Sequence, residues 1–132
     1  MQIKYNFYSM DTIFIQGIQR RSGTNFLNAL LLMHPDCDAP VVKIREDWFL
    51  EEIELLDQYT RGLHTRWANT KWGGSPYSPG LTESYLGEAM IKLLIQGNTR
   101  IPKVLVSKTP SVKNLDRFKH YFPETKLIIL VR

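Results

Sequence analysis

The sequence predicts an α/β fold in which helices flank a parallel β-sheet in three layers. Short β-rich segments alternate with longer segments of helical periodicity, which is the pattern of strands joined by helical crossovers. The last segment, KLIILV at residues 126–131, is continuously apolar, as in a strand that is buried on both faces of a parallel sheet. With 132 residues, 43% of them hydrophobic and 23% charged, residues 1–132 are expected to form a single domain.

The first half of the chain predicts a strand, a loop and a helix in immediate succession. Residues 12–16 (TIFIQ) are β-rich, and from Thr24 apolar side chains recur at helical spacing until Pro35 ends the pattern. A second extended run, PVVKIR at residues 40–45, is expected to be the second strand. The apolar residues between positions 48 and 59 then fit one or two amphipathic helices.

The second half predicts a loop followed by two further helices and two strands. Residues 69–80 are dense in Gly, Pro, Ser and Asn and indicate a surface loop. A helix is expected over residues 81–96 with Gly97 at its C-cap, and a short buried strand over residues 103–107. Thr109 and Pro110 have the residue types that begin a helix, which we expect to end before Pro123.

Composition excludes several classes of function. The net charge of +4 suits an anionic ligand, but no run of Lys and Arg indicates nucleic acid as a partner. The apolar runs are too short to span a bilayer and the N-terminus does not resemble a signal peptide, so we expect a cytoplasmic protein. One cysteine and three scattered histidines predict neither a disulfide nor a metal site.

The loop between the first strand and the first helix has the spacing of a phosphate-binding P-loop, G-x-x-x-x-G-K-[ST], from Gly17 to Thr24. Ser22 and Gly23 stand where Gly and Lys are required, so the lysine that contacts a nucleoside triphosphate is absent. Arg21 and the short polar side chains can instead hold a smaller oxyanion. The alternative is that Ser22 only caps the helix and the arginines are solvated.

At these residues the sequence resembles sulfotransferases that use 3′-phosphoadenosine 5′-phosphosulfate (PAPS). GIQRRSGTNFLNALLLMHPDC is similar to their 5′-phosphosulfate loop, most of all in the R-S-G-T branch of tyrosylprotein and many bacterial enzymes. VSKTPSVKNLDRFKHYFPETKLIILVR is similar to that branch's K-[TD]-P, helix, F-P-x-x-K and L-x-V-R segments. The resemblance covers residues 13–35 and 104–132 well, and the middle only loosely.

The resemblance implies a nucleotide site and a catalytic pair. The residues expected to hold the 5′-phosphosulfate are Arg21, Ser22, Gly23, Thr24 and Asn25. Arg132 is expected to contact the 3′-phosphate, and Asn25 departs from the usual Thr of the family. Glu46 is the expected general base, with Asp47 as the competing choice, and a carboxylate that only begins a helix is the alternative for either. Lys108 and Arg21 would stabilise the transferring group, and no metal is needed.

The predicted function is transfer of a sulfuryl group from PAPS to a hydroxyl or amine of a carbohydrate, a peptide tyrosine or a small molecule. The acceptor pocket is expected near Trp67, Trp72 and Tyr77. The alternatives are a P-loop nucleotide-binding or kinase-like protein, or a non-catalytic fragment that only binds nucleotide. Because the family continues beyond the position of Arg132, we expect a domain incomplete at its C-terminus, with self-association through the exposed last strand.

Overall fold

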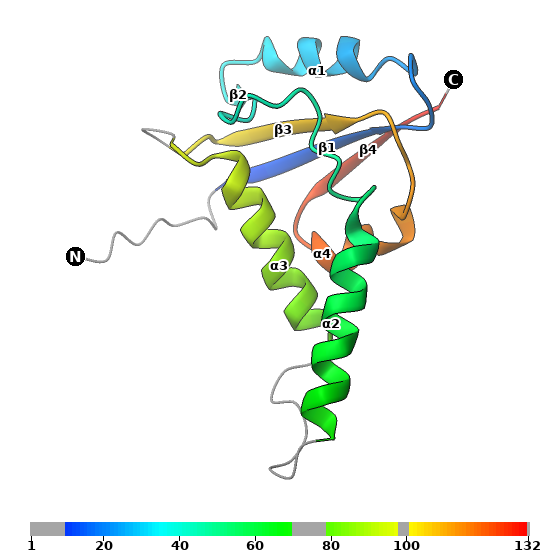
Figure 1. Cartoon of the computed structure of the whole chain (residues 1–132). Helices are drawn as coiled ribbons and strands as arrows, with labels where there is room; N and C mark the ends of the chain where they lie inside the picture. The colour runs from blue at the N-terminus through cyan, green and yellow to red at the C-terminus, as the bar shows by residue number, and fades with distance from the viewer. Residues whose placement is uncertain (1–9, 70–78, 98–100, 132) are drawn as a thin grey trace, which may run out of the picture. The chain divides into compact units, whose positions relative to one another are not determined.

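The computed structural model describes residues 10–69, 79–97 and 101–131 (Figure 1). The chain forms two compact units. The first comprises Met1–Trp48, Lys92–Val112 and Thr125–Arg132, and the second comprises Phe49–Ile91 and Lys113–Glu124. The first unit contains the whole β-sheet, and the second is helical.

Four strands form the sheet of the first unit: β1 (Asp11–Gly17), β2 (Cys37–Asp38), β3 (Val104–Thr109) and β4 (Lys126–Leu130). Their order is β2-β3-β1-β4, and every neighbouring pair is parallel (Figure 1). Parallel strands need a crossover connection, and helices occur between successive strands along the chain. The predicted α/β fold with a parallel sheet is therefore confirmed.

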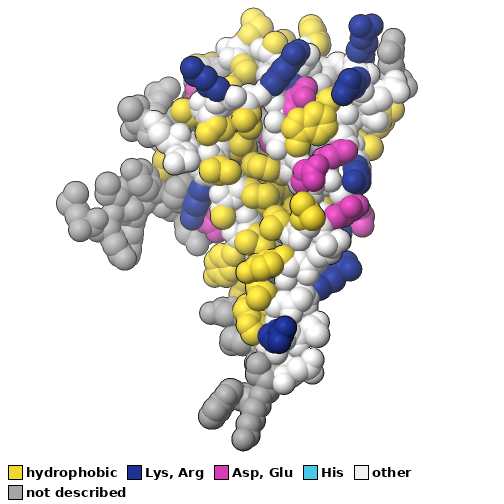
Figure 2. Space-filling view, in the orientation of Figure 1, with side chains coloured by type: hydrophobic (Ala, Val, Ile, Leu, Met, Phe, Trp, Pro, Cys, Tyr) yellow, Lys and Arg dark blue, Asp and Glu magenta, His cyan; other side chains and the backbone are white. Residues whose placement is uncertain are grey.

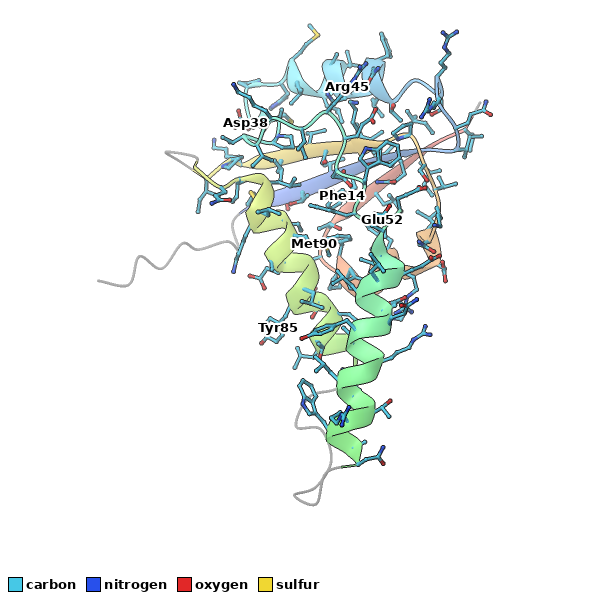
Figure 3. All side chains as sticks on the ribbon, in the orientation of Figure 1. Phe14, Asp38, Arg45, Glu52, Tyr85 and Met90 are labelled. Atoms are coloured by element: carbon cyan, nitrogen blue, oxygen red, sulfur yellow. The ribbon has the colours of Figure 1, made fainter. Side chains whose placement is uncertain are left out.

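The centre of the sheet is the core of the first unit. Phe14, labelled in Figure 3, and Ile15 are consecutive residues of β1 with exposures of 1% and 0%. Because successive side chains of a strand project to opposite faces, burial of both means that both faces of β1 are covered. Leu105 and Val106 of β3 show the same pattern. This is why the central residues of both strands are apolar in succession.

Helix α1 (Thr24–Leu32) follows β1 in the first unit and lies beside β1 and β3 (Figure 1). It begins at the predicted residue and ends three residues before Pro35. Phe26 and Leu30 of this helix and Met33 directly after it are exposed. Figure 2 shows hydrophobic and basic side chains side by side at the top of the view, where α1 lies.

The prediction of a second strand at residues 40–45 is wrong. The second strand consists only of Cys37 and Asp38, which pair with the start of β3. Bends occupy residues 41–43 and 45. The Val41 N–H donates to the Leu94 carbonyl (2.9 Å), and the Ile44 N–H donates to the Val42 carbonyl two residues back (2.6 Å). These two N–H groups are therefore not available to a neighbouring strand.

The second unit is built from helices. Helix α2 (Ile53–Ala68) lies within it, as do the 3₁₀ turn η2 (Leu115–Arg117) and the short helix α4 (Phe118–Tyr121). Helix α3 (Pro79–Leu94) also belongs to it up to Ile91, and its last turn belongs to the first unit. The predicted helix over residues 81–96 is confirmed with shifted ends, and Gly97 follows it with a φ of 87°, as expected for a C-cap glycine.

The helix predicted after Thr109 begins later than expected. Thr109 is the last residue of β3, and the first helical turn begins at Leu115. Asn114 precedes that turn with a φ of 60° and donates from Nδ2 to the Leu50 carbonyl (2.9 Å). A long-range bond from a side chain thus lies at the residue where the helical turn starts. Most of the predicted loop at residues 69–80, Trp72 and Tyr77 included, lies outside the described residues, and Pro79 and Gly80 already belong to α3.

Close packing and a buried ionic network join the helices of the second unit. Gly87 of α3 lies so close to the Tyr121 carbonyl that a Cβ at this position would overlap it. The Tyr121 hydroxyl and the Arg117 guanidinium both donate to the carboxylate of Asp57. Among the described residues, no helix has the length and apolar character needed to cross a membrane.

Candidate functional site

The strand order places a switch point between β1 and β3. The chain leaves β1 for β2, which lies beyond β3, and it leaves β3 for β4, which lies beyond β1. In open α/β sheets, ligands bind where neighbouring strands send their connections in opposite directions, at the carboxyl ends of the strands. The loop after β1 and the polar end of β3 both lie at this edge, since Gln16 pairs with Thr109.

The β1–α1 loop turns tightly over the last residue of β1. The Ile18 N–H donates to the Leu130 carbonyl of β4 (3.1 Å), and the Ser22 N–H donates back to the Gln19 carbonyl (3.3 Å). The Ser22 side chain then lies directly over Gly17, where a Cβ would overlap Ser22 Oγ. A residue larger than glycine at position 17 would require the Ser22 and Thr24 side chains to move, which explains the first glycine of the predicted loop pattern.

Two residues with left-handed backbone conformation flank Ser22 in this loop. Arg21 has a φ of 64° and Gly23 has a φ of 97°, so both lie in the left-handed region. Alternation of this kind turns successive N–H groups toward one side and forms an anion-binding concavity. For Arg21, which carries a side chain, the conformation costs on the order of 1 to 3 kcal/mol, and such costs are typical of functional sites.

Ser22 does not cap α1. The N-cap residue is Gly23, with no side-chain capping hydrogen bond, and the first turn contains no acidic residue. The Ser22 hydroxyl is buried and has no hydrogen-bond partner among the described residues. The part of the alternative in which Ser22 caps the helix is therefore wrong, whereas its other part agrees with the exposure of Arg20 and Arg21. An unused hydroxyl beside an uncapped helix N-terminus is what an anion requires.

The remaining predicted loop residues differ in their exposure. Thr24 is buried at the start of α1, whereas Arg21 and Asn25 are exposed. The two exposed side chains are thus free of the core and can contact a ligand in solution. Arg132, predicted to contact the 3′-phosphate, lies outside the described residues.

Lys108 is buried at the carboxyl end of β3. It is 7% exposed, and its Nζ atom has no hydrogen-bond partner among the described residues. The nearest anion is Glu46, whose Oε1 lies 3.6 Å from Nζ. A buried ammonium is costly unless it is paired or contacts a ligand. The structure thus brings together the two residues predicted as base and electrophilic stabiliser, which are far apart in the sequence.

The segment that carries Glu46 is fastened to the end of β3 by three hydrogen bonds. Ser107 Oγ donates to Asp47 Oδ2 (2.5 Å), and the Asp47 N–H donates to the Lys108 carbonyl (3.3 Å). The Trp48 N–H donates to Thr109 Oγ1 (3.1 Å). Trp48 has a φ of 57°, so a second left-handed non-glycine residue lies at this site.

Sequence reasoning missed Ser107 and Thr109. Both are almost fully buried, with exposures of 3% and 2%, and both hold the segment around Glu46 through their hydroxyls. A signal was present in the sequence, because three polar residues in a row end a strand that is otherwise apolar (VLVSKT). Such a run at the carboxyl end of a parallel strand is where a site is expected.

The one cysteine, Cys37, lies at the opposite edge of the sheet from this site, beside the start of β3. Burial, followed by the neighbouring carboxylates of Asp36 and Asp38, raises the pKa of the Cys37 thiol above its ordinary value. The thiol therefore stays protonated, and a protonated thiol is a poor nucleophile. Within the described ranges, no three His, Cys, Asp or Glu side chains are grouped so as to hold a metal ion.

Comparisons of this chain with protein-family models, with curated proteins and with solved structures found no match. The site is therefore interpreted from its own residues and geometry.

Proposed function

We propose that this chain binds the 5′-phosphosulfate of PAPS and carries the catalytic pair of a sulfotransferase. The observation that carries the proposal is the pairing of buried Lys108 with Glu46 at the end of β3. Next to it, on the neighbouring strand, is a glycine loop with an uncapped helix N-terminus and an unused hydroxyl. An anion site and a base beside an ammonium are the two parts that transfer of a charged group requires.

The loop residues fit a phosphosulfate group. The Ser22 hydroxyl and the first N–H groups of α1 can donate to its oxygens, and Arg21 can add a charge-assisted contact. PAPS supplies an activated sulfuryl group: the acceptor oxygen bonds to its sulfur while the bond from sulfur to the 5′-phosphate oxygen breaks, and 3′-phosphoadenosine 5′-phosphate leaves. The absence of the P-loop lysine, where Gly23 stands, favours this ligand over a nucleoside triphosphate with its bound metal.

The catalytic pair has complementary roles in this proposal. Glu46 accepts the proton of the acceptor hydroxyl, and the buried Lys108 ammonium stabilises the negative charge that develops during transfer. The low exposure of Lys108 strengthens its effect, because charges interact more strongly where water is excluded. The acceptor can be a carbohydrate, a peptide tyrosine or a small molecule.

Isothermal calorimetry tests the proposal directly. The chain is titrated with 3′-phosphoadenosine 5′-phosphate, with PAPS and with Mg-ATP under the same buffer conditions. We expect both 3′-phosphorylated nucleotides to bind more tightly than Mg-ATP. Tighter binding of Mg-ATP would instead identify a P-loop nucleotide-binding or kinase-like protein. Binding without any sulfuryl transfer to a panel of acceptors would identify a non-catalytic nucleotide-binding chain.

Self-association through β4 is part of the same proposal. Among the described strands, β4 pairs with β1 alone and ends the order of the sheet, and Ile129 on it is 42% exposed. An apolar edge strand can pair with a second copy. Sedimentation velocity should show a concentration-dependent larger species that Ile129→Lys reduces, and a monomer at all concentrations would contradict it.

A further inference from the structure

Two consecutive carboxylates, Glu46 and Asp47, make entirely different contacts at the end of β3. Side chains alternate along a strand, so Lys108 projects from one face of β3, whereas Ser107 and Thr109 project from the other. Glu46 meets Lys108, and Asp47 meets Ser107. The two carboxylates thus contact side chains on opposite faces of β3.

The structure assigns Ser107 and Asp47 as positioning residues: their hydrogen bond fixes the segment so that Glu46 stays beside Lys108. Asp47 is then the anchor of the base rather than an alternative base. The role of these residues in catalysis rests on the proposed function, but their effect on the position of Glu46 does not.

The physical need for such an anchor follows from the properties of the pair. A glutamate on a loop loses side-chain entropy when it is held in one place, and a single contact at 3.6 Å compensates little of that loss. The hydrogen bond from Ser107 to Asp47 is charge-assisted and shielded, since Ser107 is 3% exposed. The hydrogen bond between Ser107 and Asp47 therefore restrains the weaker contact between Glu46 and Lys108, one residue away.

The backbone of the segment supports the same conclusion. The Asp47 N–H donates to the Lys108 carbonyl and the Trp48 N–H donates to Thr109 Oγ1, so the segment follows the end of β3 residue by residue. Trp48 is held in the left-handed region at a φ of 57°. A tryptophan adopts this conformation only where its surroundings over-determine it.

A zero-length carbodiimide cross-link measures the positioning without any nucleotide. The reagent joins a carboxylate to a contacting amine, so the Glu46–Lys108 amide reports their contact and is quantified by mass spectrometry. The exposed Asp36–Lys103 pair, 3.4 Å apart, provides an internal standard in the same sample. The readout is the ratio of the initial rates of the two cross-links.

Two variants that remove the Ser107–Asp47 hydrogen bond should lower the cross-link ratio, and two that keep it should not. Ser107→Ala and Asp47→Ala remove the hydrogen bond and should lower the ratio about two- to tenfold. Asp47→Asn keeps an acceptor oxygen and Ser107→Thr keeps the donor hydroxyl, so both should retain most of the ratio. The matched control is Thr12→Val, which removes another buried hydroxyl from the opposite end of β1 and should leave the ratio unchanged.

Two results would overturn the assignment. One is an unchanged ratio in both alanine variants, which would show that Glu46 stays beside Lys108 without the anchor. The other is an equal decrease in Thr12→Val, which would show general loosening of the sheet. Because no nucleotide is present, these results are independent of the calorimetry: preference for Mg-ATP would overturn the proposed function and leave the positioning intact.

Discussion

The Nζ atom of Lys108 lies 3.6 Å from Oε1 of Glu46, so a buried ammonium at the end of β3 faces the carboxylate of a distant loop. The two residues are far apart in the sequence. The parallel sheet creates the contact, because the loop that carries Glu46 follows the carboxyl end of β3.

Glu46→Gln should lower the rate of sulfuryl transfer about 10²- to 10⁴-fold, because the amide retains shape and hydrogen bonding but cannot accept a proton. Nucleotide affinity should change little, since Glu46 lies beside the end of β3 and not in the β1–α1 loop. The measurement is steady-state transfer in a form of the protein that turns over. Asp47→Asn is the control and should have a much smaller effect. A large loss in Asp47→Asn with Glu46→Gln active would reverse the two roles.

Arg21→Ala should weaken nucleotide binding far more than Arg20→Ala. Both side chains are exposed, but Arg21 has left-handed backbone immediately before Ser22 and the start of α1. Loss of one hydrogen bond to a charged group costs about 1.5 to 3 kcal/mol. Calorimetry of the two variants measures the difference. Equal losses would mean that the arginines act only as diffuse positive charge.

Gly17→Ala should disrupt the loop, because its Cβ would overlap Ser22 Oγ and would lie 2.7 Å from Thr24 Cγ2. We expect a loss of nucleotide binding and destabilisation by about 1 to 3 kcal/mol, as for an overpacked core. Chemical denaturation and calorimetry measure the two effects. The control is Gly62→Ala on α2, where nothing lies within 4 Å, and it should stabilise by about 0.5 to 1 kcal/mol.

A double variant separates the clash from a general effect of alanine at this position. Adding Ser22→Gly to Gly17→Ala removes the overlapping hydroxyl and should restore part of the stability without restoring binding. If the double variant is less stable than Gly17→Ala alone, the overlap with Ser22 is not the cause of the loss.

Acid should destabilise the second unit through Asp57. Burial opposes ionisation of this carboxyl, but hydrogen bonds from Tyr121 (2.6 Å) and Arg117 outweigh it and lower the pKa below its ordinary value of 3.8. The unfolded chain therefore binds this proton more tightly, so the stabilisation is present above about pH 4 and is lost as pH falls below it. Denaturant unfolding over this range measures the loss. Asp57→Asn should flatten this acid limb, and an unchanged limb would exclude Asp57 as its source.

Alkali should act on the same network through Tyr121. Burial, followed by the hydrogen bond to Asp57, raises the pKa of this phenol above its ordinary value of 10. The unfolded chain then loses the proton first, so stability falls as pH rises above about 10. Tyr121→Phe should flatten this alkaline limb and lower stability at neutral pH by about 1.5 to 3 kcal/mol, since the bond to a charged group is lost. The exposed Tyr59→Phe is the matched control and should change neither quantity.

The sequence by itself determined the elements whose signals are local. Strand β1, its loop and the start of α1 follow from an apolar run, Gly17 and the helical periodicity after Thr24, and all three lie where they were predicted. Strand β4 and helix α3 are also correct to within a few residues, but β4 is not buried on both faces as expected, because each of its side chains is half-buried or exposed. Local signals suffice there because burial of an apolar face and the conformational limits of a tight turn involve neighbouring residues.

Only the tertiary structure decided the order of the strands and the contacts of the site. Residues 40–45 have the composition of a strand but contain bends, and the last helical segment starts only at Leu115, next to the bond from Asn114 to Leu50. The same holds for Glu46 beside Lys108 and for Asp47 on Ser107. Backbone groups and charges take whichever partner the fold brings to them, and a partner that is distant in the chain leaves no periodic signal in the sequence.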